Sequence, residues 1–255
     1  MRHLRLVVSY DGENYVGWQV QPNGMSVQQR LEEAWFATTQ ETIRIVASGR
    51  TDSGVHALGQ VCSVATVSSH PTNTLLRALN AHTPDDISII QVDRAPDGFH
   101  AIRDATEKTY RYQIQFGRIR NPLKRRDHWF CHYELNIEAM RSAATYLVGE
   151  LDFASFEAVG AKRNTTIRNM SRLECNMITE QSFQYLHIEL TSNGFLYNMV
   201  RNIVGTLVKV GQGTRTPDWV QEVLLAKDRS VAGPTAPAHG LVLVEVEYDG
   251  IQFEG

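Results

Sequence analysis

The chain has 255 residues, a formal net charge of −3 and an apolar fraction of 42%, which is ordinary for a globular protein with a sizeable core. No apolar run approaches the roughly 20 residues that a membrane-spanning helix needs, and no signal peptide is expected before the first strand-like run. The three cysteines, Cys62, Cys131 and Cys175, are widely spaced and form no C-x-x-C pair. We therefore expect buried, reduced thiols and a cytoplasmic protein.

The first half of the chain predicts alternating strands and helices. Ser26 and Gln29 form a capping-box pattern at the start of the first helix, and apolar residues at helical spacing follow. The predicted strands are 4–10, 43–47, 60–67 and 87–94, and the predicted helices are 26–39 and 72–81. The order is β-α-β-loop-β-α-β.

The second half roughly repeats this order. Thr216 is expected to be the N-cap of the last helix, with Pro217 in its first turn. The predicted strands are 106–116, 128–133, 166–178, 182–190 and 241–248, and the predicted helices are 137–147, 195–210 and 217–226. Two β-α-β-β-α-β halves, 1–104 and 105–255, imply an α+β fold with antiparallel sheets and helices on one face.

The block Gly49–Ala57 places a single carboxylate, Asp52, in a glycine-bracketed turn between two predicted strands. Loops of this kind commonly carry catalytic groups, and the pattern fits a nucleophile, a general base or a metal ligand. A plain Asx-turn fits it about equally well. The block holds no second carboxylate, which argues against a two-acid glycosidase.

The same block, Gly-Arg-Thr-Asp-Ser-Gly-Val-His, closely resembles the catalytic motif of the TruA family of tRNA pseudouridine synthases. Six further segments also resemble motifs of this family, and together with the block they occur in the family's order. They are 10–12 with 15–19, 99–101, 108–112, 152–156, 199–205 and 236–241. The resemblance implies the pseudouridine synthase fold, with two similar subdomains sharing a mostly antiparallel sheet and a basic cleft between the halves. It also implies an isomerase without metal or cofactor that acts on uridines 38, 39 and 40 of the tRNA anticodon stem-loop, and a homodimer.

The resemblance assigns roles to five residues. Asp52 is the catalytic carboxylate, which either attacks covalently or accepts a proton. Arg201 is its ion-pair partner across the cleft, although by spacing alone it fits a solvent-facing arginine better. Arg50 fills the space left by the flipped base, with a phosphate contact as a close alternative. Tyr110 stacks on uracil, although a strand tyrosine is more often core, and Leu241 forms the apolar wall of the base pocket.

The middle of the chain is basic. Five cations lie between Arg118 and Arg126, and six more lie nearby in sequence: Lys108, Arg111, Lys162, Arg163, Arg168 and Arg172. A solvated face is the simple explanation, and a phosphate-binding strip is the alternative. The run His128–His132 does not match a usual zinc pattern.

One position departs from the family pattern. After Phe99-His100-Ala101 the family usually continues with arginine, whereas here Ile102 takes that position and Arg103 follows. If the arginine usual in the family binds RNA, that contact is lost or supplied differently here, which bears on substrate choice rather than on the reaction class. Two alternatives to a synthase remain: a catalytically silent RNA-binding module of the same fold, against which Asp52, Arg201 and Tyr110 argue, and a metal-dependent hydrolase, which lacks a ligand cluster.

Overall fold

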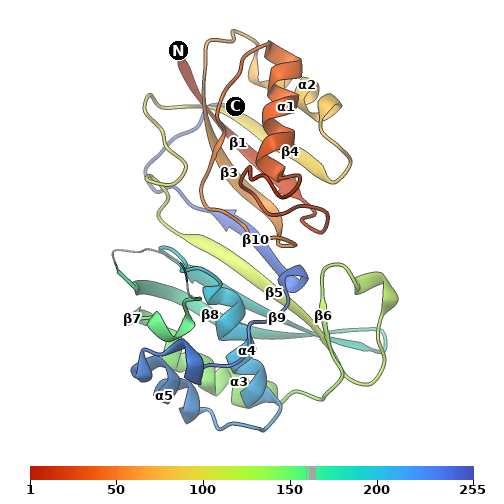
Figure 1. The fold of residues 1–255 in the computed structure, drawn as a ribbon, viewed down its shortest axis with the longest axis vertical. Coiled ribbons are helices and arrows are strands. Elements are labelled where there is room, and N and C mark those ends of the chain that lie inside the picture. Colours follow the sequence, from red (N-terminus) through yellow and green to blue (C-terminus); the bar gives the residue numbers. More distant parts are fainter. Residues whose placement is uncertain (159, 161–164) are drawn as a thin grey trace. The chain divides into compact units, whose positions relative to one another are not determined.

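The computed structural model describes residues 1–158, 160 and 165–255, and the chain divides into two compact units (Figure 1). Unit 1 consists of Met1–Thr106 together with Leu243–Gly255, and unit 2 consists of Glu107–Val242. The sequence-based division at residue 104 placed every later residue in the second half. In the structure, the C-terminal residues instead pack with unit 1.

Unit 1 is an antiparallel sheet with two helices. Its strands are β1 (Arg2–Tyr10), β2 (Val46–Ala47), β3 (His56–Thr66) and β4 (Ile87–Ala95), and its helices are α1 (Val27–Thr39) and α2 (Thr72–His82). The strand β1 lies between β3 and β4 and is antiparallel to both, with Leu6 opposite Cys62 and Val92. Alternate residues of β1 are buried, as expected for a strand with one face on a core.

An apolar cluster of unit 1 includes residues from the end of the chain. Val61, Phe99 and Tyr248 are buried together, and Phe253 packs against them. The ring centroids of Phe99 and Phe253 are 5.2 Å apart. Backbone bonds between Arg94 and Glu254 hold the last residues against β4. The C-terminal segment is therefore a part of the unit 1 core.

Unit 2 has a mostly antiparallel sheet and three helices. Its strands are β5 (Lys108–Phe116), β6 (Trp129–Cys131), β7 (Gly149–Asp152), β8 (Ile167–Glu180) and β9 (Phe183–Ser192), and its helices are α3 (Ile137–Ala144), α4 (Met199–Gly211) and α5 (Asp218–Ala226). The strand order is β5-β9-β8-β7, and the short β6 pairs in parallel with β5. Helix α4 is buried over most of its length. The last strand, β10 (Leu241–Val246), begins in unit 2 and ends in unit 1.

The α+β class with mostly antiparallel strands is confirmed, and the helices lie close to their predicted positions. Some boundaries were wrong. The strand predicted at 43–47 is reduced to Val46–Ala47, and β7 was not predicted. Thr216 does not cap α5, which begins after Pro217 without a side-chain cap. No helix in the described ranges combines the length and the apolar character needed to cross a bilayer.

Candidate active site

The loop that carries Asp52 is held by the N-terminal block of the chain. The Trp18 amide donates to the Thr51 carbonyl oxygen at 3.0 Å, and the hydroxyl groups of Tyr10 and Thr51 are 2.7 Å apart. Gly17 forms an isolated antiparallel bridge with Asp52. Burial raises the pKa of the Tyr10 phenol well above its ordinary value, so Tyr10 contacts Thr51 as a neutral group.

Glycines make this close approach possible. A Cβ atom at Gly12 would overlap the Val55 carbonyl oxygen, and one at Gly17 would crowd the backbone of Thr51 at 2.7 Å. Gly17 and Gly54 also adopt positive φ angles of 111° and 76°, which L-residues avoid. The two glycine motifs of the sequence therefore interlock, and their backbones position the acid.

Asp52 and Arg50 flank a buried residue. Thr51 is 6% exposed, whereas Asp52 is partly exposed and Arg50 is exposed. Neighbouring residues of an extended segment point to opposite sides, so Arg50 and Asp52 share the accessible side of the loop.

Arg201 lies in the first turn of α4, since that helix begins later than predicted. Asn198 adopts a left-handed conformation with φ 58° and ends the preceding loop. The side chain of Asn198 then accepts a hydrogen bond from Arg201 Nη1 at 2.9 Å. Arg201 Nε donates to the Ala236 carbonyl oxygen at 2.7 Å. The guanidinium is therefore oriented by two protein oxygens at the end of a helix.

The segment 233–241 packs directly on this helix. A Cβ at Gly205 would overlap the Pro234 carbonyl oxygen, and a Cβ at Gly233 would meet the backbone of α4. The Tyr112 hydroxyl donates to the Pro237 carbonyl oxygen at 2.7 Å. Leu241 follows at the start of β10 and is 6% exposed.

Tyr110 and Tyr112 differ in accessibility. Tyr112 is fully buried at 0% exposure, whereas Tyr110 is 8% exposed. Burial raises the pKa of the Tyr112 phenol, although the Arg201 guanidinium opposes that shift. The Tyr110 ring packs edge-on against Phe195 with centroids 5.0 Å apart. Tyr110 is thus the more available ring of the two.

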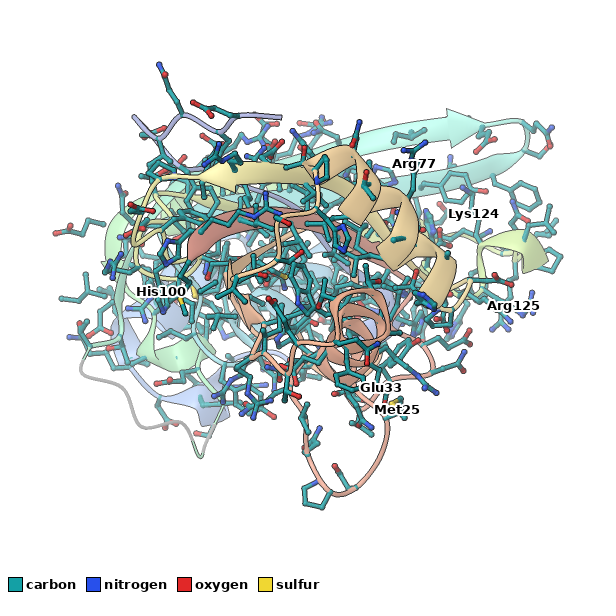
Figure 2. The ribbon with its side chains drawn as sticks, turned by 90° about the horizontal axis from the view of Figure 1, so that it is seen from above. Met25, Glu33, Arg77, His100, Lys124 and Arg125 are labelled. Atoms are coloured by element: carbon teal, nitrogen blue, oxygen red, sulfur yellow. The ribbon has the colours of Figure 1, made fainter. Side chains whose placement is uncertain are left out.

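A basic loop, defined here as Arg118–Arg126, connects β5 and β6 and includes a short 3-10 turn at Pro122–Lys124. Asn121 fixes this loop, because its amide donates to the Tyr185 hydroxyl at 2.8 Å and its backbone bonds Gln115 at 2.9 Å. Within the described chain, four of its cations form no ion pair: Arg118, Arg120, Lys124 and Arg125. Figure 2 shows Lys124 and Arg125 projecting from this loop.

Two other cations of the middle region contact a carboxylate. Arg111 and Arg172 both reach the Glu189 carboxylate, at 2.6 and 3.5 Å. Lys162 and Arg163 lie outside the described residues. Among the described cations, Arg111 and Arg172 thus contact carboxylates, whereas the four named cations of the basic loop form no ion pair.

The histidines and cysteine of 128–132 have structural partners. His128 packs against Tyr185 with ring centroids 5.2 Å apart, and His132 packs on Tyr133 at 4.0 Å. Cys131 is buried. In the residues that the structure describes, no three metal-binding side chains gather at one place.

The structure distributes the predicted site residues over the two units. Unit 1 holds Arg50 and Asp52, and unit 2 holds Tyr110, Arg201 and Leu241. Sequence reasoning missed the residues that support them: Tyr10, Gly12, Gly17, Phe195, Asn198 and Ala236. Their motifs were visible, but nothing local indicated which oxygen each one contacts.

The chain matches the family model described as tRNA pseudouridine synthase over residues 6–103 and 143–249. It is therefore an isomerase of the pseudouridine synthase class.

Relatives that align with nearly the full length of this chain indicate the family within this class. A tRNA pseudouridine synthase A from Thermoanaerobacter sp. (strain X514) is 43% identical over 97% of this chain and 100% of its own length. The protein of the same name from Geobacter sulfurreducens is 44% identical over the same shares. That from Nitrosomonas eutropha is 41% identical over 96% of this chain and 87% of its own. The chain belongs to the tRNA pseudouridine synthase family.

Proposed function

We propose that this protein converts uridine to pseudouridine at positions 38, 39 and 40 of the tRNA anticodon stem-loop, with Asp52 as the catalytic nucleophile. The reaction breaks the glycosidic C–N bond, turns the base and joins it to the ribose through carbon, so it has no need of a metal or an organic cofactor. Family membership supports the reaction class.

The observation that carries the assignment is the position of Asp52. The carboxylate stands on a loop whose neighbour Thr51 is buried and doubly bonded to the N-terminal block. A loop held this tightly presents one reactive group in one place, which is what positioning a nucleophile against a sugar requires. A merely structural Asx-turn does not need this support from a distant segment.

The other roles follow from the surroundings of each residue. Arg201, already oriented by Asn198 and Ala236, is proposed as the cation that keeps Asp52 ionised. Tyr110 is proposed to stack on the uracil and Leu241 to line the base pocket. Arg50, on the accessible side of the loop, is proposed to occupy the place of the flipped base.

The basic loop is proposed as the main phosphate contact. Its four unpaired cations are held on a rigid segment, which lowers the entropy lost on binding. The net charge of −3 then matters less than this local concentration. We further propose a cytoplasmic homodimer in which one tRNA touches both protomers.

The test is to incubate the purified chain with unmodified tRNA and to map pseudouridine by carbodiimide-stop sequencing. Stops are expected at uridines 38, 39 and 40. Asp52→Asn is expected to lower turnover at least roughly 1,000-fold, because the amide is no nucleophile, with tRNA affinity within a few-fold. Asp85→Asn, at an exposed carboxylate, is the matched control.

Two results would contradict the proposal. Stops that persist in Asp52→Asn would remove the catalytic role of Asp52. Tight binding without any pseudouridine, on several tRNAs, would favour the silent RNA-binding module.

A further inference from the structure

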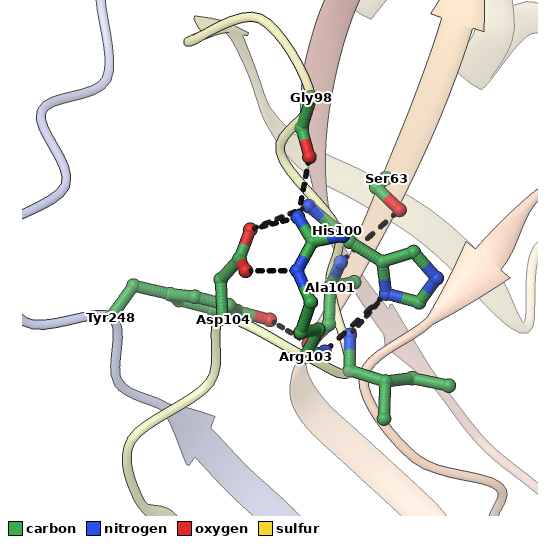
Figure 3. Close-up of polar contacts among 8 residues, drawn as sticks. Ser63, Gly98, His100, Ala101, Arg103, Asp104 and Tyr248 are labelled. Atoms are coloured by element: carbon green, nitrogen blue, oxygen red, sulfur yellow. Dashed lines mark hydrogen bonds and ion pairs between the residues drawn. The ribbon is translucent and has the colours of Figure 1, made fainter.

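The turn 98–104 of unit 1 is locked by polar contacts on every side (Figure 3). The Ala101 amide donates to Ser63 Oγ at 3.2 Å, and the Ala101 carbonyl oxygen accepts from the Tyr248 hydroxyl at 2.7 Å. The His100 amide donates to the Asp104 carboxylate at 2.8 Å. This one turn is thus tied to β3, to the C-terminal segment and to itself.

The Arg103 guanidinium binds to groups of the turn itself. Its guanidinium bonds both carboxylate oxygens of Asp104, at 2.8 and 3.2 Å, and the Gly98 carbonyl oxygen at 2.7 Å. The Arg103 guanidinium, with the His100 amide, holds the pKa of Asp104 below its usual value. The arginine one position after Ile102 therefore stabilises the turn, with its guanidinium already bonded to Asp104 and Gly98.

The same turn fixes the proton on the His100 ring. The Nδ1 atom accepts hydrogen bonds from the amides of Ile102 and Arg103, at 3.2 and 3.3 Å. A neutral imidazole that accepts at Nδ1 carries its proton on Nε2. Figure 3 shows the His100 ring standing away from the Arg103–Asp104 pair, with no bond drawn to its far nitrogen. Among the described residues, none is hydrogen-bonded to this nitrogen.

The charge around His100 indicates the kind of acceptor. Two carboxylates, Asp97 and Asp104, and one cation, Arg103, lie in or beside the turn, so its net charge is negative and unfavourable for a phosphate. The neighbouring Ile102 is an apolar side chain that is 54% exposed. An uncharged oxygen avoids the repulsion from the negative charge, and the apolar face of a base can pack on Ile102.

We propose that His100 Nε2–H donates a hydrogen bond to an uncharged oxygen of the tRNA substrate, a base carbonyl or a ribose hydroxyl, and so contributes to substrate choice. This inference rests on the proposed function. At the position where the family usually has an arginine, the turn thus presents an oriented neutral donor next to the apolar side chain of Ile102.

A pair of substitutions separates this contact from the support that His100 gives the turn. The Oδ1 atom of asparagine stands at the same distance along the side chain as Nδ1, so His100→Asn retains the acceptor for the two amides. His100→Ala removes both functions. Melting temperature, KM and kcat for pseudouridine formation are measured for both variants and the wild type.

His100→Asn is expected to melt near the wild-type temperature, with KM raised roughly three- to ten-fold, as for the loss of one neutral hydrogen bond, and kcat nearly unchanged. His100→Ala is expected to lower the melting temperature as well. A folded His100→Asn with KM within two-fold of wild type would overturn the inference. An inactive wild type would instead sink the proposed function.

Two further measurements complete the test. If His100→Asn melts as low as His100→Ala, carbethoxylation of His100 in the wild-type protein is followed by mass spectrometry: protection by tRNA supports the contact, and an unchanged rate overturns it. If His100→Asn folds, it is combined with tRNAs that carry a single 2′-deoxynucleotide or a single thiocarbonyl base. When the altered tRNA atom is the oxygen that His100 contacts, the effects on KM of the protein change and of the tRNA change are non-additive. Additivity throughout both series would overturn the contact.

Discussion

The two units hold their candidate site residues in different ways. In unit 1 the loop of Asp52 is positioned mainly by backbone atoms, beside the hydroxyl contact of Tyr10 with Thr51, and Gly12 and Gly17 allow the two segments to touch. In unit 2 Arg201 is oriented by side-chain hydrogen bonds to Asn198 and Ala236. A backbone interlock tolerates no added atom, whereas a side-chain network is open to graded adjustment. Changes in unit 1 should therefore cost stability and activity together, and changes in unit 2 should separate them.

The largest effect is expected at Gly12. Gly12→Ala places a methyl group onto the Val55 carbonyl oxygen, and we expect the free energy of unfolding to fall by about 3 kcal/mol, as in overpacked cores. Turnover should fall with it because the Asp52 loop moves. Gly194→Ala is the control, since its Cβ would meet only Arg168 side-chain atoms at 3.5 Å. Urea unfolding measures the free energy of unfolding of both variants. Equal stability of Gly12→Ala and Gly194→Ala would contradict the backbone interlock in unit 1.

At Asn198 we expect a smaller effect, which lowers activity and leaves stability nearly unchanged. Asn198→Gly keeps the left-handed backbone and removes only the bond to Arg201. We expect nearly unchanged stability and kcat/KM lowered about ten-fold, the loss of one hydrogen bond to a charged group. Asn198→Ala should be roughly 1 kcal/mol less stable than Asn198→Gly, because alanine is strained there. Equal activity of Asn198→Gly and wild type would show that Arg201 needs no orientation by Asn198.

The smallest effect is expected on the basic loop. Replacing Arg118 and Arg125 with glutamine should leave stability unchanged and make log Kd for tRNA less dependent on log salt, by roughly 1.5 units of slope. The control replaces Arg30 and Arg44, whose charges Glu33 and Glu32 already balance. Filter binding over a range of salt concentrations gives the slopes. The same slope in both double variants would discard the loop as a phosphate contact.

Local pattern was enough to predict the α+β class and most of the helices. Ser26 shows why: its side chain accepts from the Gln29 amide, a contact within one turn that spacing alone reveals. The expected reciprocal contact is absent, because Gln29 bonds Glu33 instead. The motif around Asp52 likewise indicated the acid and its flanking glycines before any contact was known.

Contacts between distant segments were not predictable in this way. The start of α4 at Met199 depends on the left-handed Asn198, and the orientation of the Arg103 guanidinium depends on Asp104 and Gly98. The return of 243–255 to unit 1 depends on Phe253 meeting Phe99 and Tyr248. The periodicity of a sequence does not predict which distant residue a side chain will contact.

By itself, the sequence determined most of the elements, the glycine-bracketed turn that carries Asp52 and the family resemblance, because helix caps, strand alternation and glycine turns are local properties of the chain. The tertiary structure alone decided which groups are oriented, which charges are balanced and which donor is left facing outward. Those outcomes depend on hydrogen bonds between residues far apart in sequence, such as Gly12 with His56 and Tyr112 with Pro237. Such bonds exist only after the backbone has folded.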